Sequence, residues 1–264
     1  MHNSAELFTF AERTADKNNS ATASKCLYIR HKRRRNRRIC LVSNEGGWLR
    51  WSATFFKKKR IMGLIKQLFT NCACPQGRMG RAMLKFMNLC HAPLTNWGLK
   101  LVNIQDGWTM LDIGCGGGAT LQRLLKRSKD AQVYGIDISE ESVAKAKKVN
   151  EEVLDKQVFV TQGSAEKLPY EDGKFDLVTA VETVYFWPNL PNCLQEVRRV
   201  LKSGGKFAIM VEVVDGDSMW TNVVEGMTAY SPEELKTMLD DAGFTQTEIH
   251  RMKPSNATII GIKG

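Results

Sequence analysis

The fold of this chain is decided by the stretch LDIGCGGGA at residues 111–119. An apolar strand candidate, Thr109–Ile113, precedes the glycines, and a helix candidate, Ala119–Arg127, follows them. Glycine has no Cβ atom, so the backbone can turn sharply there and a ligand can approach it closely. The helix that follows directs its free amides and its positive dipole end toward the same place. The stretch predicts a ligand-binding turn, with a tight turn that binds nothing as the alternative.

Strand and helix candidates alternate from residue 108 onward. This order predicts a parallel sheet with helices on both faces. The last two strand candidates flank the turn-rich link KPSN at residues 253–256, which predicts a hairpin. We therefore expect an α/β fold, a doubly wound, seven-stranded, mostly parallel sheet with a C-terminal antiparallel hairpin. The other strand candidates are Gln132–Ile136, Val158–Thr161, Phe175–Val181, Lys206–Val213, Gln246–Met252 and Ala257–Ile262. The other helix candidates are Glu140–Val153, Leu190–Leu201 and Pro232–Ala242, the last with the capping box Ser231-Pro232-Glu233-Glu234.

The bulk composition is typical of a soluble protein with one sizeable core. The chain has 264 residues, of which 43% are hydrophobic and 25% are charged. No apolar run approaches the ~18 residues that a membrane-spanning helix needs, so we expect no integral membrane association. The seven cysteines are irregularly spaced, which argues against a disulfide framework and for a reducing compartment. We expect a cytoplasmic protein.

The net charge of +10 comes from the N-terminal region. Residues 1–61 hold 15 Lys or Arg against four Asp or Glu, whereas residues 62–264 hold 23 against 24. We expect residues 1–61 to form a basic, disordered leader that could bind phosphate groups, so that a nucleic acid is a partner only through these residues. A solvated extension without a partner and an upstream reading-frame extension ahead of Met62 remain as alternatives.

Residues 62–107 are expected to form a helical N-terminal cap in front of the main domain, residues 108–264. Apolar residues at helical spacing predict one helix over Arg78–Cys90, and a second follows Pro93 to about Asn103. The methionines of the first helix are interpreted as core filling. They are Met79, Met83 and Met87.

Some residues that could suggest chemistry have simpler explanations. Cys72 and Cys74 lack a second pair at metal-ligand spacing, so no metal site is expected. His91 and His250 are isolated in the sequence, and each is expected to be satisfied or exposed.

The glycine turn and its surroundings resemble motif I of the class I, Rossmann-like, S-adenosylmethionine-dependent methyltransferases. The likeness covers about residues 93–264. Gly114-x-Gly116-x-x-Ala119 also fits the dinucleotide fingerprint, but Asp112 lies where a dinucleotide site normally has an apolar residue. A carboxylate there suits the cationic amino group on the methionine part of the cofactor. The closing hairpin is likewise expected of methyltransferases and not of hydride-transfer domains.

The resemblance implies a set of cofactor-binding residues. VYGIDIS at residues 133–139 resembles the next family motif, in which Asp137 would accept hydrogen bonds from both ribose hydroxyls and Ile138 would pack on adenine. GSAEKLPY at residues 163–170 resembles the adenine-contacting loop, where many relatives have Asp in place of Ser164. The implied cofactor-binding residues are Asp112, Gly114, Cys115, Gly116, Asp137, Ile138, Ser164 and Ala165. VLKSGGKF at residues 200–207 matches a later motif, and its glycines are expected to form a helix C-cap.

The acceptor side follows the fourth strand candidate. Glu182 could contact the methionine moiety or act as a general base. Tyr185 and Trp187 could line the acceptor pocket and face the sulfonium; Phe186 and Trp187 could instead be buried packing. Residues 215–230 form a second candidate wall of this pocket.

The expected activity is transfer of the methyl group of S-adenosylmethionine to a small-molecule or lipid-like acceptor. The protein would mainly position the reactants, because the cofactor supplies the activated group. The alternatives are an RNA- or protein-directed methyltransferase that uses the basic leader, a non-catalytic cofactor-binding protein, and a dehydrogenase.

Overall fold

The chain divides into two compact units, Met1–Lys66 and Gln67–Gly264. The computed structural model describes Leu84, Met87–Glu212 and Met227–Gly264 in full, and only the backbone of four strands in the first unit. These strands are β1 (Leu7–Phe10), β2 (Cys26–Ile29), β3 (Ile39–Asn44) and β4 (Gly47–Trp51), and they form an antiparallel sheet in that order. They fall inside residues 1–61, whose disorder and boundary remain predictions.

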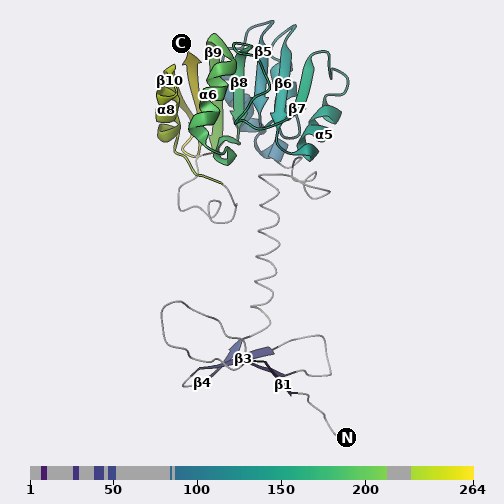
Figure 1. The fold of residues 1–264 in the computed structure, drawn as a ribbon, viewed down its shortest axis with the longest axis vertical. Helices are drawn as coiled ribbons and strands as arrows, with labels where there is room; N and C mark the ends of the chain where they lie inside the picture. The colour runs from purple at the N-terminus through teal and green to yellow at the C-terminus, as the bar shows by residue number, and fades with distance from the viewer. Residues whose placement is uncertain are drawn as a thin grey trace. The chain divides into compact units, whose positions relative to one another are not determined.

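The second unit is built on one sheet of seven strands in the order β10-β11-β9-β8-β5-β6-β7 (Figure 1). The strand β11 pairs antiparallel with both of its neighbours, whereas the pairs from β9 to β7 are parallel. The strands are β5 (Thr109–Ile113), β6 (Gln132–Asp137), β7 (Val158–Gln162), β8 (Phe175–Val181), β9 (Leu201–Glu212), β10 (Phe244–Lys253) and β11 (Asn256–Lys263). The predicted α/β class, the seven-stranded sheet and the antiparallel hairpin are confirmed.

Helices cover both faces of this sheet. They are α3 (Ala92–Leu101), α4 (Ala119–Leu125), α5 (Glu140–Val149), α6 (Leu190–Val200) and α8 (Pro232–Asp241), with a 3-10 turn, η1, at Val184–Phe186. Alternate residues of a strand belong to different buried clusters, because successive side chains point to opposite faces. In β5, Met110 packs in the cluster that includes α3, α4 and α5, and Leu111 packs in the cluster that includes α6 and α8. Each face of the sheet thus has its own apolar core.

The sequence located the elements to within a few residues, with one exception at the start of β9. That strand begins at Leu201 and not at Lys206, and α6 ends with Leu201 in extended conformation. Gly204, with a φ of 76°, lies inside β9. The pairing of β9 with β8 shifts register at this point, between Phe175 and Leu177 of β8. The prediction of a glycine helix C-cap here was wrong, because the glycines absorb a strand irregularity instead.

Part of the predicted N-terminal cap lies within the described residues. Met87–Cys90 are helical, and α3 begins at Ala92 with Pro93 in its first turn. The carbonyl of His91 accepts hydrogen bonds from the amide of Thr95 at 2.9 Å and from its hydroxyl at 2.8 Å. The expected helix from Arg78 otherwise lies outside the described residues, as do Met79 and Met83.

The capping box of α8 gives a test of local stability. Ser231 Oγ accepts from the amide of Glu234 at 3.2 Å, and Glu234 accepts from the amide of Ser231 at 2.7 Å. We expect Ser231→Ala to lower the free energy of unfolding by about 1 kcal/mol, because the amide of Glu234 loses its acceptor. Urea denaturation followed by circular dichroism would measure it. The control is Thr237→Ala, on the exposed side of the same helix, and an equal loss in both variants would contradict the prediction.

Candidate functional site

The turn between β5 and α4 depends on glycine for steric reasons. Gly114 has a φ of 75°, and a Cβ atom on it would overlap the hydroxyl of Thr183. Gly118 is the N-cap of α4 with a φ of 79°, and a Cβ atom there would lie 2.8 Å from Cα of Ala146 in α5. Both positions combine a left-handed conformation with a close neighbour, so other residues are excluded on two grounds. The backbone of the turn is therefore held against β8 on one side and α5 on the other.

Asp137 ties this turn to the next strand. It ends β6, and its carboxylate accepts hydrogen bonds from the amide of Gly116 at 2.8 Å and from the amide of Ser139 at 2.9 Å. Burial raises the pKa of Asp137, and these hydrogen bonds oppose the rise. Each carboxylate oxygen has a second lone pair that can accept from a ligand hydroxyl.

Asp112 lies beneath the turn and is 2% exposed. Its Oδ1 accepts a hydrogen bond of 2.6 Å from the hydroxyl of Thr179 in β8. Burial is the largest cause that raises the pKa of Asp112 to about 7, and repulsion from Asp137 adds to it. Asp112 pairs with Gly135 in the sheet, so Asp112 and Asp137 lie on the same face, two positions apart. Asp112 is not among the residues that line the cavity described next.

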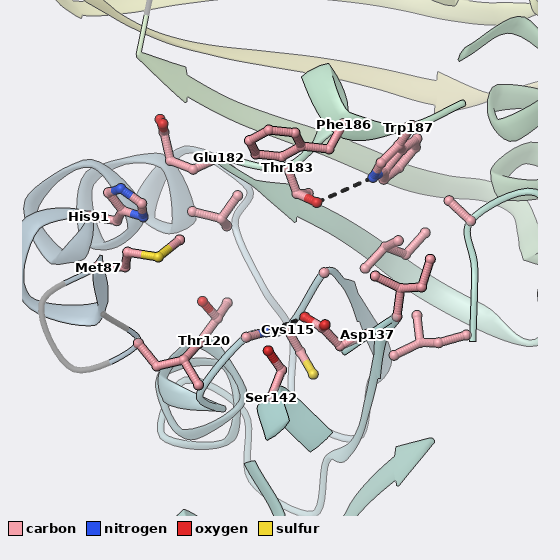
Figure 2. Close-up of a pocket in the computed structure, with 18 of the residues that line it drawn as sticks. Met87, His91, Cys115, Thr120, Asp137, Ser142, Glu182, Thr183, Phe186 and Trp187 are labelled. Atoms are coloured by element: carbon pink, nitrogen blue, oxygen red, sulfur yellow. Dashed lines mark hydrogen bonds between the residues drawn. The ribbon is translucent and has the colours of Figure 1, made fainter. Parts of the chain in front are cut away.

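A cavity opens above the carboxyl ends of β5, β6 and β8 (Figure 2), with about 1020 Å³ of space that includes open solvent. This is where ligands bind in open parallel sheets. Of the predicted cofactor-binding residues, all but Asp112 line this cavity. They are Gly114, Cys115, Gly116, Asp137, Ile138, Ser164 and Ala165.

One side of the cavity has the features of a nucleoside site. Ile138 is 63% exposed, an unusual state for a large apolar side chain, and it lies directly after Asp137. Ser164 Oγ accepts from the amide of Glu166 at 3.3 Å, so its hydroxyl hydrogen can still be donated to a ligand. Cys115 is buried, which raises the pKa of its thiol well above the usual value and makes it an unreactive thiol.

Glu182 lies at the carboxyl end of β8 in a left-handed conformation, with a φ of 55°. Its carboxylate accepts from the amide of Glu212 and, at 2.6 Å, from the hydroxyl of Tyr185. Burial raises the pKa of Glu182 to about 7. Glu182 lines the cavity, whereas Tyr185 is not among the lining residues. The roles of both residues in the reaction remain predictions.

Trp187 is both packing and cavity wall. Its ring is 9% exposed and stacks on Phe207 with centroids 6.3 Å apart. Its Nε1 donates to the hydroxyl of Thr183 at 3.3 Å, on the cavity side (Figure 2). Phe186 also lines the cavity. The two alternatives for Trp187 are therefore compatible.

Some cavity residues were missed by the sequence analysis. Met87, interpreted as core filling, and His91, expected to be satisfied or exposed, lie together on one side of the cavity and line it (Figure 2). The sequence around Met87 and His91 did not indicate a site, because these residues reach the cavity only when the cap packs onto the sheet. The other lining residues that were missed are Leu84, Asn88, Thr95, Ile113, Thr120, Arg123, Ile136, Ser142, Gly163, Val181, Thr183 and Pro188.

Three further predictions concern a second wall of the acceptor pocket, a metal site and a membrane-spanning helix. The candidate wall at residues 215–230 lies largely outside the described residues, as do Cys72 and Cys74. In the part of the chain that is described, no group of three His, Cys, Asp or Glu residues could hold a metal ion. No helix there has the length and apolar character needed to cross a bilayer.

Comparison with known proteins identifies the family. A family model described as a methyltransferase domain matches residues 104–243, which include the glycine turn, Asp137 and Glu182. The chain belongs to this methyltransferase family. The expectation of a class I S-adenosylmethionine-dependent enzyme is confirmed, and S-adenosylmethionine is its cofactor.

Individual relatives agree with this assignment. An uncharacterized methyltransferase of Bacillus subtilis, YdaC, is 32% identical over 59% of this methyltransferase and 82% of its own length. The sterol 24-C-methyltransferase ERG6B of Gibberella zeae is 36% identical over 45% of the chain and 32% of its own length. The crystal structure of a SAM dependent methyltransferase from Aquifex aeolicus is similar with a TM-score of 0.54 and 28% identity, over 64% of this chain and 89% of that one. This methyltransferase thus spans about a third of the sterol enzyme.

The buried acid Asp112 gives a pH-dependent test of this methyltransferase. Its folded pKa is about 7 against an ordinary 3.8, so the folded state keeps a proton between these values that the unfolded state has lost. The free energy of unfolding should therefore fall as pH rises from 4 to 7, and Asp112→Asn should reduce this slope by up to about 1.4 kcal/mol per pH unit.

Urea unfolding of both proteins at pH 4, 5.5 and 7 measures the effect. Near pH 4 the carboxyl of Asp112 is neutral in the folded protein, so the two proteins should have similar stability there, and asparagine can still accept from Thr179. At pH 7, the free energy of unfolding of Asp112→Asn should be higher, relative to the parent protein, than it is at pH 4. A stability difference that does not change with pH would show that Asp112 does not titrate in this window.

Proposed function

We propose that this protein transfers the methyl group of S-adenosylmethionine to a small-molecule or lipid-like acceptor. One observation carries the proposal: a single cavity is lined both by Asp137 and Ile138, which suit a nucleoside, and by apolar side chains that include Met87 and Phe186. A cofactor and an apolar acceptor could lie there next to each other. The sterol substrate named for one relative is of this kind, although the shared length is too small to transfer the acceptor.

The nucleoside side is proposed to bind the cofactor as follows. Asp137 accepts hydrogen bonds from the ribose hydroxyls with its remaining lone pairs. Ile138 packs on the adenine ring, which would cover its exposed apolar surface. Ser164 and Ala165 contact the adenine edge. Gly114, Cys115 and Gly116 bring bare backbone close to the cofactor, because no side chain intervenes at the glycines.

The methionine part is proposed to lie toward β8. Asp112 would act from beneath the turn, where a nearby ammonium group would favour its ionised form and lower its raised pKa. Glu182 would contact the same moiety at the cavity wall. Tyr185 would position Glu182 through their 2.6 Å hydrogen bond. Both acids are buried, and their charge is weakly screened there.

The chemistry asked of the protein is mainly positioning. The cofactor, when bound, supplies a methyl group on a cationic sulfur. The methyl group is already activated for transfer, because the sulfonium sulfur is a good leaving group. The cavity residues would align the acceptor in line with the methyl–sulfur bond and exclude water. A non-catalytic cofactor-binding protein would instead bind the cofactor without turnover. Incubation of labelled cofactor with a metabolite extract, followed by identification of any labelled product, separates the two.

Asp137 provides the sharpest test of cofactor binding. We expect Asp137→Ala to weaken S-adenosylmethionine binding by about 10-fold or more, or on the order of 1.5–3 kcal/mol, because charge-assisted hydrogen bonds are lost. Isothermal titration calorimetry would measure the affinity. Asp155→Ala, an exposed acid away from the cavity, is the control. Unchanged affinity in a folded Asp137→Ala variant would remove the ribose role.

The basic leader supports a second candidate, an RNA- or protein-directed methyltransferase. Its net charge of +11 contrasts with −1 for the rest of the chain. If the acceptor is a small molecule, deletion of residues 1–61 should leave kcat/KM within about 3-fold, because the cavity lies in the second unit. A loss of methylation that appears only with RNA or protein acceptors would favour the second candidate.

A further inference from the structure

His91 lies at the acceptor side of the cavity. Figure 2 shows it with Met87 and Glu182 on one side and Asp137 on the other. Its side chain is half-buried and makes no capping hydrogen bond to α3. Among the described residues, none makes a hydrogen bond or an ion pair with the imidazole, and His91 lines the cavity.

The backbone fixes where this ring lies. The amide of His91 donates to the carbonyl of Met87 at 2.9 Å, and its carbonyl accepts twice from Thr95. His91 therefore sits at the junction between the helical residues Met87–Cys90 and α3 and is held from both sides. The backbone position from which the side chain of His91 projects is therefore fixed.

The other ionisable side chains that line the cavity already have hydrogen-bond partners, or are held as a thiol or a cation. Both oxygens of Asp137 already bind backbone amides, on the nucleoside side. Both oxygens of Glu182 accept hydrogen bonds, from Tyr185 and Glu212. Cys115 is held as a thiol and Arg123 is a cation. Among the described lining residues, His91 is left with a ring nitrogen that can accept.

The surroundings keep this imidazole neutral. Burial lowers the pKa of His91. The ring is attached at the N-terminus of α3, where the positive end of the helix dipole disfavours an imidazolium. A neutral imidazole is the form that can act as a base.

Resting on the proposed function, we propose that His91 is the general base of the reaction and that the acceptor is an apolar molecule with a weakly acidic hydroxyl of the phenol type. Met87 lies beside His91 (Figure 2), and Leu84 and Phe186 are further apolar residues that line the cavity, so the cavity suits an acceptor with an apolar body. A phenol hydroxyl, with a pKa of about 10 in tyrosine, is closer to the basicity of imidazole than an aliphatic alcohol is.

The proposed step conserves atoms and charge. The hydroxyl oxygen attacks the methyl carbon, and a carbon–oxygen bond forms as the carbon–sulfur bond breaks with its electron pair kept by sulfur. The hydroxyl proton passes to the free ring nitrogen of His91. One positive charge thus moves from sulfur to the imidazole, which then releases its proton to water. The products are a methyl ether and S-adenosylhomocysteine.

The test uses the full chain with methyl-labelled S-adenosylmethionine and a panel of apolar phenols, with matched anilines, thiols and alkenes. His91→Gln should lower kcat/KM for phenols by about 100-fold or more, because glutamine is polar but cannot accept the proton. Calorimetry should show S-adenosylmethionine affinity within about 3-fold of the parent. His250→Gln is the matched control, since His250 pairs with Glu248 at 3.1 Å outside the cavity and should change neither value.

A second variant separates proton transfer from a structural role. His91→Ala should lose activity in the same way and regain at least about 10-fold of it when imidazole is added, because the free base can occupy the vacated space. A loss without rescue, an unchanged His91→Gln variant, or a panel in which no phenol is methylated would overturn the inference. If anilines, thiols or alkenes are methylated instead, the proposed function stands while this inference fails; if cofactor binding is itself absent, the proposed function fails.

Discussion

The site depends on one constraint, the close approach of bare backbone between β5 and α4. Gly114 lies against Thr183 of the β8 end and Gly118 against α5, so the turn is wedged between two elements that come later in the chain. The hydrogen bond from the Gly116 amide to Asp137 then fixes the turn to β6. A side chain at Gly114 or Gly118 would overlap these elements and push them apart.

Two buried acids give this methyltransferase an electrostatic character suited to a cationic ligand. Asp112 and Glu182 both have a pKa raised to about 7 by burial, and they lie beneath and beside the same cavity. Such burial costs folding free energy, because the charged forms lose their hydration. A positively charged ligand would recover part of that cost by favouring the ionised carboxylates. The same arrangement that weakens the empty protein at neutral pH thus favours binding.

The acceptor side is assembled from parts distant in sequence. Some lining residues, among them Met87 and His91, come from the cap, and others, among them Glu182 and Phe186, come from the end of β8 and the residues that follow it. The carbonyl of Tyr185 also accepts a hydrogen bond of 2.9 Å from the amide of Thr228, a residue that precedes α8. The cavity wall therefore joins the cap to the end of β8, whereas the part proposed to bind the cofactor is formed at the ends of β5 and β6.

The sequence by itself determined the sheet, the glycine turn and the strand ends that line the cavity beside it, because these depend on local patterns. The patterns are strand and helix periodicity, glycines after a strand, and an acid at the end of the next strand. Each of them extends over about 30 residues or fewer. Tertiary structure alone decided that Asp112 lies beneath the cavity and not in its wall, and that His91 and Met87 face it. Those positions follow from sheet pairing and from how the cap packs, and neither is encoded in the residues around them. The β9 glycines were misread for the same reason, since a register shift is a property of two strands together.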